Sequence, residues 1–250
     1  MSDADDAILA IDAGNTRIKW AVHDGHAWSA PGAIATSESA SLYESMRPAL
    51  PVDRAVACNV AGAEVRARIE DACRSAGIEV DVIASQRSQL GVTSGYREPS
   101  QLGADRWAAL VAAHRGYPGH KLVVNAGTAL TIDALAADGN FMGGLIVPGP
   151  ALMRRSLDLG TAGLRLADGH MREFPQDTAD AITSGSIQAS IGAIARLGFE
   201  MSARDCPVSR IILSGGAAGE IAAWLPYPAI LQDNLVLDGL IAIARGVRAL

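Results

Sequence analysis

The chain has 250 residues, of which 49% are hydrophobic, and its formal net charge at pH 7 is −6. This apolar content suffices for a sizeable core in one large domain or two ordinary ones, whereas the acidic balance argues against nucleic acid as the main partner. Because no segment reaches the roughly 18 apolar residues of a membrane span and the N-terminus lacks the basic start of a signal peptide, we expect a cytoplasmic protein with no membrane partner.

In the first half of the chain, short apolar runs alternate with segments of helical period. The pattern predicts strands over 8–11, 18–22, 55–60 and 79–83, and helices over 64–76 and 103–114. Strands that alternate with helices are typical of α/β proteins.

The second half of the chain repeats this organisation. The pattern predicts strands over 121–124, 130–134, 141–147 and 210–213, and helices over 151–157, 178–197 and 235–247. No Gly/Ser-rich or Pro-rich linker separates the halves, so we expect a tight junction. We divide the chain into an N-terminal lobe, residues 1–117, and a C-terminal lobe, residues 118–250.

Two strand–turn–strand units share one sequence pattern. The turn Asp12-Ala13-Gly14-Asn15-Thr16 has a counterpart in Asn125-Ala126-Gly127-Thr128, and each turn follows one strand and opens onto another. One such unit in each half predicts a duplicated domain with a cleft between the copies. Chance similarity of so short a segment is the alternative.

Glycine at the tip of such a turn exposes backbone N–H groups that can bind phosphate, because no Cβ blocks the approach. Asn15, Thr16 and Thr128 add side-chain donors, and the ammonium of Lys19 could reach the same anion. Asp12 repels phosphate, but its carboxylate can hold a Mg²⁺ ion that bridges to the phosphates. Either turn alone could simply be a favoured hairpin turn, whereas two of them favour nucleoside triphosphate binding.

Six motifs follow one another along the chain: Asp12–Thr16 with Lys19, Gly103–Arg106, Gly127–Asp133, Gly143–Gly149, Leu213–Gly216 and Asn234–Leu240. Neither the P-loop pattern GxxxxGK[ST] nor a strand-linked GxGxxG pattern occurs. This ordered set spans nearly the whole chain and resembles the type III pantothenate kinases, which belong to the acetate and sugar kinase, Hsp70 and actin superfamily. The resemblance implies an α/β fold of duplicated actin-like (ribonuclease H-like) domains, with mixed sheets flanked by helices and a cleft between the domains.

The resemblance also implies a reaction, the ATP-dependent phosphorylation of pantothenate to 4'-phosphopantothenate as the first step of coenzyme A biosynthesis. It implies Mg²⁺ as cofactor, ATP and pantothenate as small-molecule partners, and a homodimer. The implied ATP-binding residues are Asp12, Ala13, Gly14, Asn15, Thr16, Arg17, Ile18, Lys19, Gly127 and Thr128. The implied substrate-binding residues are Tyr96, Gly103, Ala104, Asp105, Arg106 and Thr178, with Asp105 also as the catalytic base.

Three of these residues have plainer interpretations from the sequence alone. Asp105 could merely complement the dipole at a helix N-terminus, and Arg106 could be a surface residue paired with a neighbouring acid. Thr178 could be only a helix cap. By the resemblance, Asp105 accepts the proton of the pantothenate hydroxyl, Arg106 pairs with the anionic substrate and Thr178 contacts it.

Asn125 departs from the family pattern, because family members typically have aspartate at this position. In the family that carboxylate is associated with a bound monovalent cation, potassium or ammonium. Asparagine still offers a carbonyl oxygen but removes the negative charge. Dependence on a monovalent cation is therefore a weaker expectation than the kinase activity.

Three other functions stay open at this point. One is a degenerate enzyme that binds ATP without transferring phosphate, for which Asn125 is the only evidence. A kinase or phosphatase of the same superfamily could act on a different small acceptor, although the segment 96–106 favours pantothenate. A non-catalytic transcription accessory factor is the alternative from another class, and the net charge of −6 argues against it.

The remaining polar and aromatic residues give weaker signals. Cys58, Cys73 and Cys206 have no metal-ligand spacing and are expected to be small buried residues in a reducing compartment. Trp107 could pack beneath the Asp105–Arg106 pair, with ordinary core packing as the alternative. The pair Arg154-Arg155 could bind phosphate but is expected on a solvated helix face.

Overall fold

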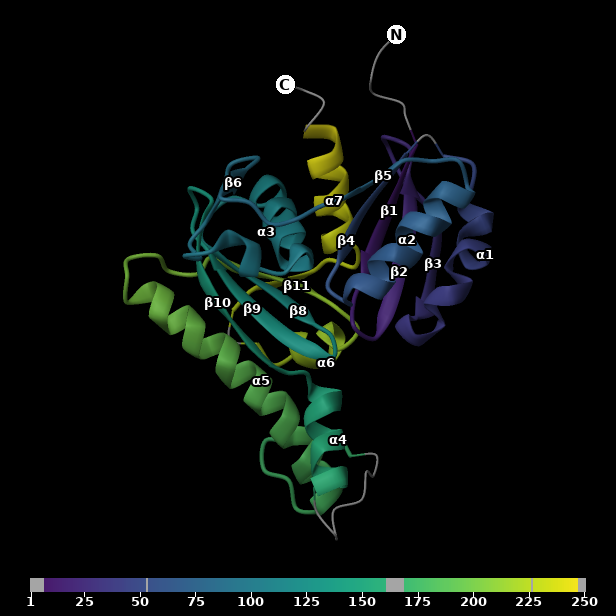
Figure 1. Cartoon of the computed structure of the whole chain (residues 1–250). Helices are drawn as coiled ribbons and strands as arrows, with labels where there is room; N and C mark the ends of the chain where they lie inside the picture. Colours follow the sequence, from purple (N-terminus) through teal and green to yellow (C-terminus); the bar gives the residue numbers. More distant parts are fainter. Residues whose placement is uncertain (1–6, 53, 161–168, 226, 247–250) are drawn as a thin grey trace. The chain divides into compact units, whose positions relative to one another are not determined.

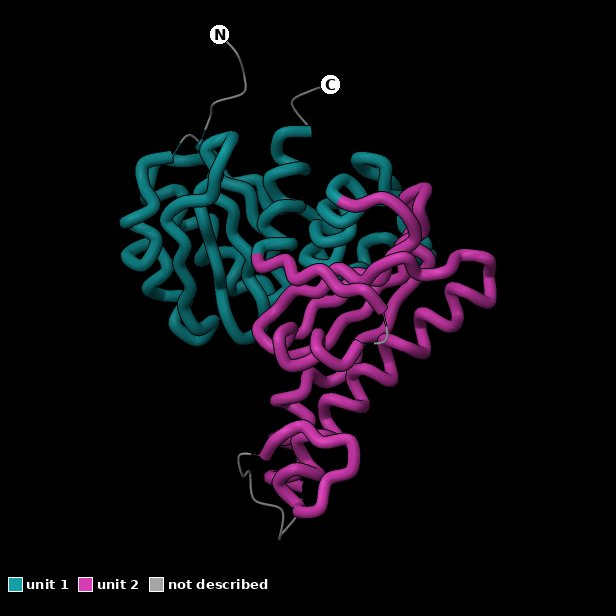
Figure 2. The backbone as a smooth tube through the Cα atoms, turned by 180° about the vertical axis from the view of Figure 1, so that it is seen from behind, with its two compact units in different colours: residues 1–116, 234–250 teal, residues 117–233 magenta. Residues whose placement is uncertain are grey.

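The computed structural model describes residues 7–52, 54–160, 169–225 and 227–246. The chain divides into two compact units, residues 1–116 with 234–250 (unit 1) and residues 117–233 (unit 2) (Figure 2). The division at residue 116 lies one residue before the boundary drawn from the sequence. The C-terminal segment, however, belongs to unit 1 and not to the second lobe in which we had placed it.

Unit 1 contains a mixed sheet with the strand order β3-β2-β1-β4-β5 (Figure 1). The first three strands are antiparallel, whereas β4 and β5 run parallel to β1. The strands are β1 (Ile8–Ala13), β2 (Arg17–His23), β3 (Trp28–Ala35), β4 (Arg54–Asn59) and β5 (Val80–Val82). Because parallel pairing needs a crossover, helical segments connect β3 to β4 and β4 to β5.

Helices cover both faces of this sheet. Leu9 and Ile11 of β1 share one hydrophobic cluster with Val65 and Ile69, which stand at helical spacing on α2. The opposite face of β1 and β4 contacts α7. The α-helices of unit 1 are α1 (Leu42–Met46), α2 (Ala63–Ser75), α3 (Ala104–Gly116) and α7 (Leu235–Gly246). Its short 3₁₀ segments are Thr36–Ser41, Arg47–Ala49 and Pro99–Gln101. The hairpin of β6 (Ser88–Gln89) and β7 (Val92–Ser94) comes before the 3₁₀ segment Pro99–Gln101 in the chain.

Close contact between α3 and α7 depends on Gly239. A Cβ at Gly239 would lie 1.9 Å from the carbonyl oxygen of Ala108 on α3. We expect Gly239→Ala to lower the free energy of unfolding by about 1–3 kcal/mol, because the two helices must separate. Gly192→Ala on α5 is the matched control, since a Cβ there meets nothing within 4 Å, and it should stabilise by roughly 1 kcal/mol. Urea titration of both variants measures the difference, and equal stabilities would contradict the prediction.

Unit 2 repeats the topology of unit 1. Its strands follow the order β12-β11-β8-β9-β10, with β8, β9 and β10 antiparallel and with β11 and β12 parallel to β8. The segments are β8 (Lys121–Ala126), β9 (Ala129–Leu135), β10 (Asn140–Pro148), α4 (Pro150–Gly160), α5 (Thr178–Ser202), β11 (Arg210–Ser214), α6 (Ala218–Ala222) and β12 (Ala229–Leu231). This repetition confirms the duplicated mixed α/β fold expected from the two similar turns.

One face of the second sheet is covered by α5 and α6. Leu122 and Val124 of β8 pack with Ile194 of α5 and Ile221 of α6, and all four side chains are fully buried. Arg154 on α4 corrects the expectation of a solvated face, because its guanidinium donates to the Ser186 hydroxyl at 3.3 Å and to the Glu220 carboxylate at 3.2 Å. Within the described ranges, no helix is long and apolar enough to cross a membrane.

Candidate active site

The first phosphate turn joins β1 to β2 in unit 1. The Gly14 N–H donates to the Arg17 carbonyl at 3.0 Å, and the Thr36 hydroxyl donates to the Gly14 carbonyl at 2.7 Å. These bonds fix a turn whose tip residues, Asn15 and Thr16, are exposed. The turn therefore presents backbone and side-chain donors to solvent, as a phosphate site requires.

Alternation along β1 and β2 separates the residues expected to bind ATP into two groups. Arg17 and Lys19 are exposed on one face of β2, and Lys19 lies opposite Asp12 in the antiparallel register. Ala13 and Ile18 are fully buried in the core on the other face. Only the backbone of these two buried residues is available to a ligand.

Asp12 is a partly buried carboxylate whose charged form is disfavoured by its surroundings. Burial, followed by the negative charge of Asp105, raises its pKa from 3.8 to about 6. Cys58 on β4 opposes this effect by donating a hydrogen bond from Sγ to Asp12 Oδ1 at 3.3 Å, and so does the charge of Lys19. A carboxylate held near a second one in a desolvated place is a favourable site for a divalent cation.

Asp105 lies in the first turn of α3, close enough to Asp12 for its charge to be felt there. Burial raises the pKa of Asp105, while the backbone N–H of Arg106, which donates to Asp105 Oδ1 at 2.8 Å, and the Arg106 charge lower it. The structure thus brings Asp12, Lys19 and Asp105 together in unit 1. Two nearby carboxylates with raised pKa values are typical of a catalytic site.

Gly103 sets the position of the Asp105 carboxylate. A Cβ at residue 103 would lie 2.5 Å from Asp105 Oδ1 and 3.6 Å from Val60. We expect Gly103→Ala to displace the carboxylate and to lower kcat by about 10–100-fold, with the thermal unfolding midpoint little changed. Gly116→Ala at the other end of α3 is the control, because a Cβ there has open space. Steady-state kinetics of both variants provide the test, and a wild-type kcat in Gly103→Ala would contradict it.

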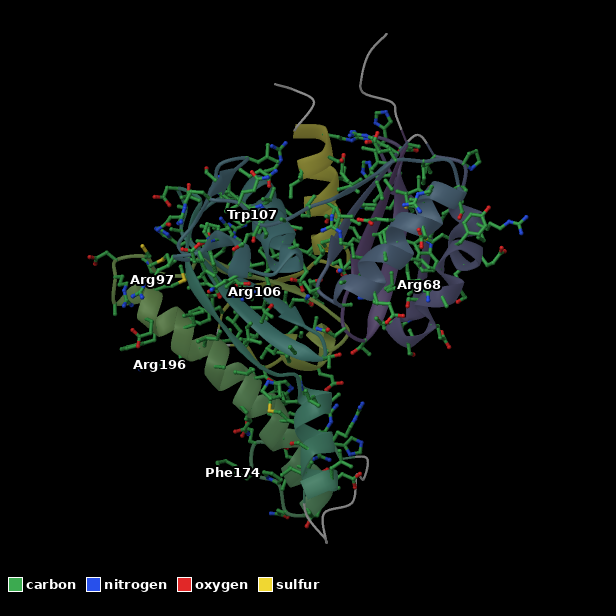
Figure 3. All side chains as sticks on the ribbon, in the orientation of Figure 1. Arg68, Arg97, Arg106, Trp107, Phe174 and Arg196 are labelled. Carbon is green, nitrogen blue, oxygen red and sulfur yellow. The ribbon has the colours of Figure 1, made fainter. Side chains whose placement is uncertain are left out.

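Arg106 is buried, with 6% of its surface exposed, which corrects the alternative of a surface ion pair. Its guanidinium lies over the Tyr96 ring at 5.8 Å and donates to the Tyr96 hydroxyl at 3.2 Å. Figure 3 shows Arg106 and Trp107 on α3. Trp107 is fully buried and donates to Gln89 at 2.8 Å, so ordinary core packing accounts for it.

A further arginine, which sequence reasoning missed, holds the segment that carries Tyr96. The Arg87 guanidinium donates to the carbonyls of Tyr96 and Arg97, both at 2.8 Å. The Ser85 hydroxyl lies 2.6 Å from the Pro99 carbonyl oxygen and 2.8 Å from the Leu102 carbonyl oxygen, and its single proton can be donated to either. No sequence signal identifies such residues, because their partners are backbone carbonyls that any sequence supplies.

The second phosphate turn joins β8 to β9 in unit 2. The Gly127 N–H donates to the Ala129 carbonyl at 3.1 Å, and Gly127 and Thr128 are exposed. Gly149 packs directly on this turn, since its N–H donates to the Thr128 carbonyl at 2.8 Å and a Cβ there would lie 2.1 Å from the Gly127 carbonyl oxygen. The motif ending in Gly149 therefore supports the turn.

Asn125 and Thr178 also lie in unit 2. Asn125 is on β8 beside Gly215, where a Cβ would lie 2.7 Å from Asn125 Oδ1. Thr178 is the exposed first residue of α5, and the N-cap is Asp177, whose carboxylate accepts from the Asp180 N–H at 2.8 Å. The helix-cap alternative for Thr178 is therefore wrong, while its contact with substrate stays a prediction.

Comparison with protein families gives a match over residues 8–198 to the family model described as type III pantothenate kinase. The type III pantothenate kinase of Aromatoleum aromaticum is 48% identical over 238 residues, covering 95% of this chain and 98% of the relative. That of Dechloromonas aromatica is 44% identical over 233 residues, covering 93% and 97%.

Solved structures with low sequence identity share the fold. A Sinorhizobium meliloti protein described as a 2-dehydro-3-deoxygalactonokinase superposes with a TM-score of 0.64 at 17% identity, covering 97% of this chain and all of the other. A ROK family glucokinase from Streptomyces griseus in complex with glucose and AMPPNP gives 0.52 at 14% identity, covering 97% and 99%. A Campylobacter jejuni protein described as a Baf family transcriptional activator gives 0.62 at 20% identity, covering 97% and 100%. These likenesses establish the actin-like sugar-kinase fold alone.

Proposed function

The chain belongs to the type III pantothenate kinase family, and we propose that its two phosphate turns and Asp105 carry out the ATP-dependent phosphorylation of pantothenate to 4'-phosphopantothenate, the first step of coenzyme A biosynthesis. The observation that carries the assignment of roles is the pair of partly buried carboxylates, Asp12 and Asp105, beside an exposed glycine turn. One carboxylate suits a metal–phosphate complex and the other suits the acceptor hydroxyl.

Asp105 is the residue that we assign to the acceptor. Its carboxylate accepts a hydrogen bond from the pantothenate hydroxyl, orients the oxygen toward the γ-phosphorus and takes the proton as the new P–O bond forms, while the bond from the γ-phosphorus to the bridging oxygen breaks and ADP leaves. A loose transition state needs little early proton abstraction, so orientation contributes at least as much as basicity. We assign the carboxylate of pantothenate to the guanidinium of Arg106, and the contact of this guanidinium with Tyr96 supports the assignment because Tyr96 is also an expected substrate-binding residue.

The residues of unit 1 fit a Mg²⁺ ion of the kind that accompanies ATP. Mg²⁺ keeps several waters and takes one or two protein carboxylates together with substrate phosphates. Asp12 supplies such a carboxylate, in a position where burial and the negative charge of Asp105 raise its pKa to about 6. Among the described residues no group of three or more His, Cys, Asp or Glu side chains could hold a metal ion by themselves, which agrees with a site completed by phosphates.

The proposed reaction is tested by ADP release from purified protein with ATP and Mg²⁺, with and without pantothenate. We expect turnover that depends on pantothenate and yields a phosphorylated product of the corresponding mass. ATP hydrolysis that pantothenate leaves unchanged, from folded protein, would exclude pantothenate as the acceptor. A panel of small hydroxyl and carboxylate acceptors would then test the other superfamily kinases.

We propose that Asn125 occupies the position of a weakened monovalent-cation site. Asn125→Asp restores one negative charge and should lower the potassium concentration for half-maximal activity by about fivefold, since a favourable interaction of about 1 kcal/mol is gained. Activity is measured in potassium, ammonium and sodium buffers for both proteins. Equal activity in all three buffers for both proteins would count against any cation site.

We also propose a cytoplasmic homodimer, as the resemblance implies. Several large apolar side chains of unit 2 are exposed and could be covered by a second copy: Leu145, Ile146, Leu152, Leu157, Leu159 and Phe174. Sedimentation measurements distinguish dimer from monomer.

A transcriptional role has no support beyond the shared fold. It would need a gel shift with DNA by a protein that shows no ATP turnover.

A further inference from the structure

Cys58 is the buried residue in direct contact with the proposed metal carboxylate. It lies on β4 in parallel register with Asp12 on β1, and its side chain has no exposed surface. The thiol donates from Sγ to Asp12 Oδ1 at 3.3 Å, a normal distance for a hydrogen bond that involves sulfur. The phosphate-turn, acceptor and family motifs named above do not include Cys58.

The contact constrains the Asp12 carboxylate in a way that the strand backbone alone does not. A carboxylate rotates freely about its terminal bond unless its oxygens are held. The Cys58 thiol donates to Oδ1, so the orientation of both carboxylate oxygens depends on this contact. Lys19, on the exposed face of β2, is too flexible a partner to set this orientation, since lysine has four rotatable side-chain bonds.

We propose that Cys58 is a positioning residue, whose thiol holds the Asp12 carboxylate in the one orientation that receives the magnesium–nucleotide complex. This role rests on the proposed function only through Asp12. Cys58 contacts neither substrate nor metal, and its effect should pass entirely through the Asp12 carboxylate. Replacing the thiol should therefore alter binding of the Mg²⁺-nucleotide complex and leave binding of the acceptor unchanged.

Three variants test the proposal. Cys58→Ala removes the donor, Cys58→Ser keeps a donor in nearly the same place, and Cys73→Ala removes a second fully buried thiol, on α2, as the matched control. We expect Cys58→Ala to raise the Mg²⁺ concentration for half-maximal activity and the KM for ATP by about 3–10-fold, with the KM for pantothenate unchanged. Cys58→Ser should restore both values to within about threefold, and Cys73→Ala should keep wild-type values.

A readout other than activity separates this proposal from the proposed function. The Mg²⁺-dependent rise in thermal midpoint with a non-hydrolysable ATP analogue should shrink in Cys58→Ala and recover in Cys58→Ser. In an Asp12→Asn background, Cys58→Ala should have no further effect on this shift. Three results would overturn the proposal. The thermal shift could shrink equally in Cys58→Ser and Cys58→Ala, or Cys58→Ala could reduce it further when the Asp12 carboxylate is already absent. Wild-type values for Cys58→Ala would also contradict it. If the wild-type protein does not turn over pantothenate, the proposed acceptor is wrong. The thermal shift with Mg²⁺ and the nucleotide analogue still tests the role of Cys58 in that case.

Discussion

Asp105→Asn is expected to lower kcat by about 10²–10⁴-fold while the KM for ATP stays near the wild-type value. The amide keeps the shape of the side chain but cannot take the proton of the acceptor hydroxyl, and its –NH₂ group cannot accept a hydrogen bond from it. Burial raises the pKa of Asp105, so this carboxylate is protonated at a higher pH than an ordinary aspartate. As the pH is lowered, the wild-type kcat should therefore begin to fall at a pH above the usual pKa range of aspartate. Steady-state kinetics across pH provide the measurement.

Asp81→Asn is the matched control for this substitution. Asp81 is an exposed aspartate in the same unit, on β5, where it is paired in the parallel register with Val56 of β4. It should retain wild-type kinetics. A comparable loss in both variants would indicate a general effect on the fold, and a wild-type kcat in Asp105→Asn would show that another residue orients the acceptor.

Asp12→Asn is expected to abolish most Mg²⁺-dependent nucleotide use, with a loss of about 100-fold or more in kcat/KM for ATP. The same substitution should stabilise the ligand-free protein at pH 7. Burial and the Asp105 charge raise the pKa of Asp12 from 3.8 to about 6, so the folded protein binds this proton more tightly than the unfolded chain. The proton therefore contributes stability that is full below pH 3.8 and is lost as the pH rises through about 6.

The asparagine variant lacks this pH-dependent loss, because its side chain is neutral at every pH. Thermal unfolding with a chelator present should give equal midpoints for the two proteins near pH 4 and a higher midpoint for the variant above pH 6. Adding Mg²⁺ with a nucleotide should stabilise the wild type more than the variant, whose smaller shift is still measurable at high nucleotide concentration. A variant less stable than the wild type at pH 7 without ligand would contradict the proposed burial of an uncompensated charge.

The sequence predicted the strands and helices that have a clear hydrophobic period. It missed strands that are short or only partly buried. The predicted strands and helices around both turns are present, because buried strands and long amphipathic helices have clear periods. The strand β3 was missed, since only some of its residues are buried and its sequence contains proline and glycine. The two-residue and three-residue strands β6, β7 and β12 were missed for lack of length.

The sequence by itself determined the family and the duplicated turns, because ordered motifs and glycine turns are local features that can be seen without the fold. Only the tertiary structure showed which other residues contact Asp12, Asp105 and the segment that carries Tyr96. It placed the Cys58 thiol on Asp12, the Gly103 backbone against Asp105 and the Arg87 guanidinium on the Tyr96 segment. It also packed α7 on α3 through Gly239. The Cys58–Asp12 and Gly239–Ala108 contacts arise from sheet register and helix packing, which join residues far apart in the sequence and leave no pattern at either residue.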